Sequence, residues 1–187
     1  STLSVTAAEN TIVGSFAGDA ITSASNCVLM GVHAGGALEL GGANVAIGHS
    51  ALRNETDYGN NVAIGEQALT AQDAGATAYN VAVGYKAGVN VSTSVQNVLI
   101  GGEAGDALTT GGYNIAIGFR ALSAEDAHGK NIAIGAEALR VQDAGADAYN
   151  VAIGFQAGVA VSTGVENTLV GGLAGDAITG GMESTFI

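Results

Sequence analysis

The stretch "NVAIGEQAL", Asn61–Leu69, decides the fold because it occurs again with small changes. The chain has "NIAIGFRAL" at Asn114–Leu122 and "NIAIGAEAL" at Asn131–Leu139. None of these copies combines a nucleophile with a base. A short apolar motif repeated in this way indicates an array of structural units, so the spacing of the copies carries the information.

The copies recur at steps of 17, with two longer steps of 19 that start at Asn61 and Asn131. Four steps make a larger repeat, so that 44–113 aligns with 114–183. We expect 10–187 to form one array after a lead-in, 1–9, and the chain to be a segment of a longer fibre. The repeats begin at Asn10, Cys27, Asn44, Asn61, Asn80, Asn97, Asn114, Asn131, Asn150, Asn167 and Ser184.

Within each repeat, "NVAIG" has the alternation and the β-branched residues of a short strand. The glycine that closes the strand permits a sharp corner, and the asparagine that opens it suits a left-handed corner. Helical repeats of the common classes are about twice as long and have a helical apolar period. The sequence therefore predicts an all-β parallel solenoid of about ten to eleven coils, each with two short strands.

Two rows of side chains follow from this frame. We expect the asparagines to stack as a corner ladder in which each amide donates to the next, with Cys27 as a substituted corner residue. We expect Val62, Ile64 and their equivalents to line the interior, which turns the alternate row outward as an apolar stripe for packing against another copy. This stripe comprises Ala46, Ala63, Ala82, Leu99, Ala116, Ala133, Ala152 and Leu169.

Composition excludes several classes of partner. The 187 residues include 17 acidic and 5 basic side chains, for a formal net charge of −12. Phosphate binding needs clustered Lys and Arg, so we expect no nucleic-acid partner. No apolar run reaches the ~18 residues of a membrane span, so we expect no membrane insertion. The single cysteine excludes an internal disulfide framework.

The candidate chemistry is sparse. His33, His49 and His128 fall at different places in the repeat, so they form no stacked ligand row. No nucleophile elbow, dinucleotide fingerprint or zinc-protease motif occurs. We therefore expect no enzyme, no cofactor and no metal site.

Two alternatives concern a monomeric solenoid. "GGEAGDAL" (101–108) and "GGLAGDAI" (171–178) are similar to the nonapeptide of calcium-binding β-rolls, although the glycine is displaced by one place. A calcium-stabilised solenoid is thus one alternative. An ice-binding solenoid is the other, since Thr109 and Thr179 recur, but only once in every four coils.

Aromatic residues keep the repeat register at two places. They are either turn plugs, which we favour, or outward rings that stack on sugars of a host glycan. These residues are Tyr85, Phe119 and Phe155 after the core glycine, and Tyr79, Tyr113 and Tyr149 before the asparagine.

Taken together, "NVAIGEQAL", "NVAVGYKAG", "NIAIGFRAL" and the final "STFI" resemble the head repeats of trimeric autotransporter adhesins of the YadA type. They are even more similar to the N-x-AIG-x-x-AL/AG arrays of bacteriophage tail fibres, and the resemblance covers 10–187. It implies a left-handed parallel β-roll, a side-by-side homotrimer, and a non-enzymatic adhesive segment. Such a segment lies outside the cell, on a virion or a bacterial surface, and contacts a host receptor or glycan.

Overall fold

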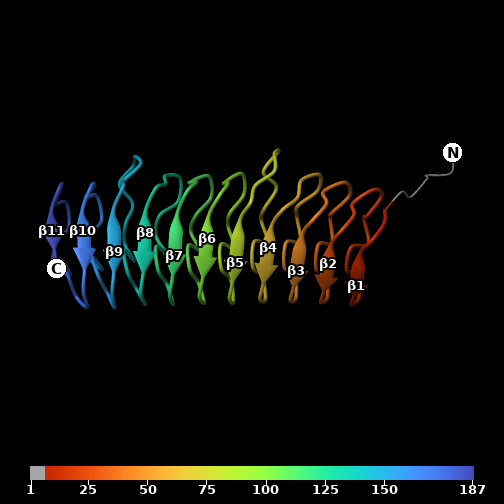
Figure 1. The fold of residues 1–187 in the computed structure, drawn as a ribbon, viewed down its shortest axis with the longest axis horizontal. Coiled ribbons are helices and arrows are strands. Elements are labelled where there is room, and N and C mark those ends of the chain that lie inside the picture. The colour runs from red at the N-terminus through yellow and green to blue at the C-terminus, as the bar shows by residue number, and fades with distance from the viewer. Residues whose placement is uncertain (1–6) are drawn as a thin grey trace.

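The computed structural model describes residues 7–187, and within them eleven strands form one parallel sheet. Each strand pairs in register with its neighbours along the chain, so consecutive coils stack (Figure 1). Figure 1 shows the strands in a single row from β1 to β11, with the loops after β4 and β8 extending furthest. The strands are β1 (Thr11–Val13), β2 (Val28–Met30), β3 (Val45–Ile47), β4 (Val62–Ile64), β5 (Val81–Val83), β6 (Val98–Ile100), β7 (Ile115–Ile117), β8 (Ile132–Ile134), β9 (Val151–Ile153), β10 (Thr168–Val170) and β11 (Thr185–Phe186).

The all-β parallel solenoid with about ten coils is thus confirmed, but each coil has one strand where two were expected. The remainder of each coil cannot extend because its backbone turns repeatedly. In the coil that begins with β7, positive φ angles occur at Gly118 (135°), Arg120 (54°) and Leu122 (53°). Left-handed residues at every second position fold this segment into successive turns.

The glycine after each strand is required by the stacking of the coils. A Cβ added to Gly118 would lie 2.5 Å from the carbonyl of Gly135 in the next coil, and the φ of Gly118 is one that only glycine adopts readily. The left-handed backbone conformation expected at the asparagine occurs instead at the residue before it. Tyr113 (φ 62°) and Lys130 (φ 65°) take that conformation, and the asparagines that follow them do not.

The sheet faces are the reverse of those expected. The alternate row of strand-centre residues, predicted to form an outward stripe, is fully buried in the protomer. Val62, Ile64 and their equivalents are partly exposed instead. An exposed fraction of 0% is found for Ala46, Ala63, Ala82, Leu99, Ala116, Ala133, Ala152 and Leu169.

The physical reason for this reversal is the small cross-section of the coil. Space across the interior does not admit a leucine both at the strand centre and at the turn position six residues later. Leu99 is accompanied by Gly105, whose added Cβ would lie 2.8 Å from the leucine Cδ2. Ala116 is accompanied by Leu122, which is also fully buried. Since a close-packed interior does not tolerate overlaps, the strand centre is alanine wherever leucine occupies the turn position equivalent to Leu122.

Candidate functional site

The outer face of the sheet is an apolar surface that runs the length of the solenoid. Its side chains come from the first and third residue of each strand, and all of them are uncharged although the chain carries 17 acidic side chains. We call it the Val/Ile face. Between β2 and β10 it comprises Val28, Met30, Val45, Ile47, Val62, Ile64, Val81, Val83, Val98, Ile100, Ile115, Ile117, Ile132, Ile134, Val151, Ile153, Thr168 and Val170.

The dimensions of this face follow from strand geometry. Strands spaced about 4.8 Å apart make eleven rows roughly 50 Å long, and the two columns are about 7 Å apart. The side chains are partly exposed throughout, with Met30, Ile100 and Ile153 each more than one-third exposed. Contiguous apolar surfaces of this extent mark contact sites in soluble proteins.

The asparagines form a buried column along one corner of the coils. The main-chain N–H of Asn114 donates to Oδ1 of Asn97 (2.8 Å), and Asn131 donates in the same way to Asn114 (3.0 Å). The amide oxygens thus accept from the main chain of the next coil, whereas amide-to-amide donation was expected. Such donation occurs from Asn97 to Asn80 (3.2 Å) and from Asn167 to Asn150 (3.1 Å). Each hydrogen bond fixes the register of one coil on the next.

Cys27 interrupts this column. Its Sγ lies 3.6 Å from the carbonyl oxygen of Gly41 and 3.4 Å from that of Ser25. Burial raises the pKa of the Cys27 thiol, and the N–H groups of Asn44 and Ala43 beside the sulfur oppose this shift. A neutral thiol that faces two carbonyls serves as a corner filler with weak hydrogen bonds.

The six aromatic residues lie on the surface, which contradicts the favoured interpretation as turn plugs. Their side chains are all about half exposed. Three of the rings carry a cation within 5.0 to 5.2 Å of the centroid, as cation–π pairs do. The pairs are Lys86 with Tyr85, Arg120 with Phe119, and Lys130 with Tyr149. Half-exposed rings can contact a sugar or a protein directly.

Two polar layers interrupt the apolar interior, one in each four-coil repeat. Glu55 and Gln72 form the first, Glu125 and Gln142 the second, and all four are fully buried. Gln72 accepts a hydrogen bond from Asn80 (2.8 Å) and Gln142 from Asn150 (3.0 Å). Burial raises the pKa of Glu55 to about 7 and that of Glu125 to about 6.

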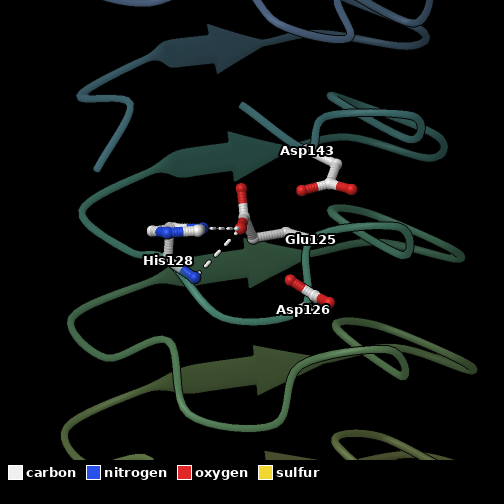
Figure 2. Close-up of side chains that lie close together, drawn as sticks. All are labelled: Glu125, Asp126, His128 and Asp143. Atoms are coloured by element: carbon white, nitrogen blue, oxygen red, sulfur yellow. Dashed lines mark hydrogen bonds and ion pairs between the residues drawn. The ribbon is translucent and has the colours of Figure 1, made fainter. Parts of the chain in front are cut away.

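Four side chains could hold a metal ion together. One ligand atom from each of Glu125, Asp126, His128 and Asp143 lies within 4.8 Å of the others (Figure 2). This cluster was not predicted from the sequence, because histidines were compared there only with other histidines. The available signal was that Asp126 and Asp143 stand at the same repeat position in adjacent coils.

Comparison with known proteins finds no matching family model, no matching curated protein and no matching solved structure. In residues 7–187 no helix has the length and hydropathy that crossing a bilayer would require.

Proposed function

We propose that this chain is a non-enzymatic structural segment of an adhesive fibre, and that three copies associate side by side as left-handed β-rolls. The observation that carries the proposal is the Val/Ile face. The number of copies, the handedness and the fibre context come from the resemblance of the repeats to adhesin heads and phage tail fibres.

The Val/Ile face suits a second copy of the same chain for two reasons. The face is uncharged, so it does not repel a second copy. The rest of the protein surface is acidic and would repel another copy at close range. The Val/Ile face is also periodic, because strands such as β6 and β7 are paired in register. Another copy aligned with it therefore presents matching rows at the same spacing, and burying the rows removes apolar surface from water.

Host contact would then fall to the surface that the assembly leaves exposed. The half-exposed Tyr79, Tyr113 and Tyr149 lie at one corner of the coils, and Tyr85, Phe119 and Phe155 lie in the turns after the strands. Rings repeated along a rigid rod support multivalent binding of a repeated glycan or receptor. This role places the protein on the extracellular surface of a virion or a bacterium.

The monomeric alternatives have weaker support. The hydroxyl of Thr109 donates to the main-chain oxygen of Asp126 in the next coil (2.9 Å), so it is engaged within the protein and is less available to order water. Asp106 and Asp176 lie four coils apart, and the intervening coils lack an acid at that position. A row of oxygen ligands for calcium does not form from them.

The test is the molar mass in solution, measured by light scattering coupled to size exclusion. We expect three times the 18.2 kDa protomer for the natural chain. The double variant Val98→Lys/Ile115→Lys places charges on the Val/Ile face and is expected to yield folded monomers. The control Gly102→Lys/Gly172→Lys adds the same charges in the turns, where neither added Cβ would clash, and is expected to stay trimeric. A monomeric natural chain at micromolar concentration would falsify the proposal.

A further inference from the structure

The coil that begins with β7 gathers three potential ligands within four residues. Glu125 points into the interior, and Asp126 and His128 follow it in the turn toward β8. Asp143 comes from the next coil at the same repeat position as Asp126. Figure 2 shows the carboxylate of Glu125 with the His128 ring on one side and the two aspartates on the other.

The hydrogen bonding of Glu125 and His128 is incomplete. Glu125 is 0% exposed, and its Oε1 accepts the main-chain N–H of His128 at 3.0 Å. The other oxygen, Oε2, is buried without a hydrogen-bond partner, and so is Nδ1 of His128, which lies 3.6 Å from Oε1. Oε2 of Glu55 in the first repeat also lacks a partner, so the distinguishing observation is the ring nitrogen. Buried polar atoms normally have partners, and a buried, unpartnered Nδ1 beside the Glu125 carboxylate points to a ligand.

The charges at this place are unbalanced. Three carboxylates approach one another, and in residues 7–187 their one ion-pair partner is His128. Of the nearby cations, Lys130 pairs with Asp147 (2.6 Å), and Arg140 lies 3.7 Å from Glu137 without a hydrogen bond to it. Like charges held together in a partly buried turn require a cation or a proton.

The first four-coil repeat provides an internal comparison. Its equivalent positions are Glu55, Thr56, Tyr58 and Asp73. Thr56 donates its hydroxyl to Oδ1 of Asp73 at 3.2 Å, so this pair is satisfied. The second repeat replaces the donor with an acceptor, Asp126, and the tyrosine with a histidine. Both changes add a metal ligand, and the satisfied pair becomes two facing carboxylates.

We propose that Glu125, Asp126, His128 and Asp143 form a binding site for one divalent transition-metal ion, of which Zn²⁺ is the representative. An imidazole nitrogen among carboxylates favours Zn²⁺ and related ions over Ca²⁺, which prefers oxygen ligands alone. Asp126 and Asp143 are not buried, so their side chains are free to rotate onto the ion, while the buried Glu125 is preorganised. The bound ion would join two consecutive coils.

The experiment is calorimetric titration of the metal-free full chain with ZnCl₂, supported by the ¹⁵N chemical shifts of the His128 ring. We expect one equivalent to bind per chain and to shift the Nδ1 or Nε2 resonance of His128. The double variant Asp126→Thr/His128→Tyr restores the residues of the first repeat and is expected to lose this equivalent while its melting temperature without metal stays the same or rises.

The reciprocal variant Thr56→Asp/Tyr58→His recreates the cluster in the first repeat. We expect it to bind two equivalents of Zn²⁺ per chain. The proposal is overturned if the natural chain binds no Zn²⁺, if Asp126→Thr/His128→Tyr binds as the natural chain does, or if folded Thr56→Asp/Tyr58→His gains no second equivalent. Tighter binding of Ca²⁺ than of Zn²⁺ by the natural chain would overturn the assigned class of ion.

Discussion

At the scale of single residues, the asparagine column shows how one side chain holds two coils together. Asn97 accepts the N–H of Asn114 through Oδ1, and its Nδ2 approaches the carbonyl of Gly111 at 3.2 Å. Cys27 stands at the equivalent position four coils earlier and offers only a sulfur atom, 3.6 Å from Gly41. The natural chain thus contains one weakened step in an otherwise repeated hydrogen-bond pattern.

Replacing this cysteine is therefore expected to stabilise the protein. Cys27→Asn supplies an amide oxygen for the Asn44 N–H and an amide donor for Gly41, and should raise the free energy of unfolding by about 1 kcal/mol. The converse variant Asn97→Cys should lower it by a similar amount. Thermal unfolding followed by circular dichroism measures both. Equal melting temperatures for Cys27→Asn, Asn97→Cys and the natural chain would show that the column adds nothing to stability.

The buried carboxyl of Glu55 makes stability depend on pH. Burial raises its pKa from 4.5 to about 7, Asp73 adds to the shift, and the N–H of Tyr58 opposes it. Since the folded state binds the proton more tightly than the unfolded state, stability should fall as the pH rises from about 4.5 to about 7, and then level off.

Glu55→Gln removes this titration and keeps an oxygen for Tyr58. We expect it to match the natural chain near pH 4 and to exceed it above pH 7 by on the order of 2 kcal/mol. Glu66→Gln removes an equal charge from an exposed position and serves as the control. Chemical denaturation from pH 4 to pH 8 gives the comparison, and parallel profiles for the natural chain and Glu55→Gln would contradict the expectation.

At the scale of the coil, the corner after the strand is the least tolerant element. Gly101 has φ +134°, and an added Cβ would lie 2.5 Å from the main-chain oxygen of Gly118. No side-chain rotation relieves a contact with backbone. Gly101→Ala should therefore destabilise the protein by on the order of 3 kcal/mol.

The neighbouring Gly102 provides the control for Gly101→Ala. Its added Cβ would meet Phe119 at an ordinary 3.6 Å, so Gly102→Ala should change the melting temperature little. Comparing the melting temperatures of the two variants distinguishes a steric conflict at the corner from the general effect of replacing a glycine. A Gly101→Ala variant as stable as Gly102→Ala would refute the close approach of the coils.

The coil also shows which part of the fold the sequence could predict. The repeat period and the position of the strand in each coil follow from the recurrence of "NVAIG". The alternation of side chains distinguishes the two faces of a strand but does not show which face is buried. The expectation that the larger side chains fill the interior selected the wrong face. The informative signal was covariation, since Leu99 occurs with Gly105 whereas Ala116 occurs with Leu122. Ala82 occurs with Gly88, but no coil has leucine at both positions, as expected of two residues that face each other across the interior.

At the scale of the whole molecule, each coil contacts only the coils before and after it, so stability is close to a sum over neighbouring pairs. The Glu125 cluster illustrates why such a sum hides local chemistry. The cluster arises because the second four-coil repeat differs from the first at two positions. That Asp126 and Asp143 meet follows only from the stacking of the coils. A search for motifs along the chain has no reason to join residues from separate coils.

The same neighbour rule predicts that a complete four-coil repeat can be excised. Removing 44–113 places the coil that begins at Asn114 directly on the coil that begins at Cys27. The junction then resembles the natural contact between the Cys27 and Asn44 coils, because Ala116, Leu122 and Glu125 repeat the residues of the removed coil. We expect the shortened chain to keep the circular-dichroism signature of the parent and to unfold cooperatively.

A deletion out of register is the matched control for this excision. Removing 44–109 leaves the segment 110–113 as an insertion at a buried corner, where it displaces the asparagine column. This second variant should melt at a clearly lower temperature than the first, although it retains more of the chain. Equal melting temperatures would mean that stacking in register does not govern the stability of this solenoid.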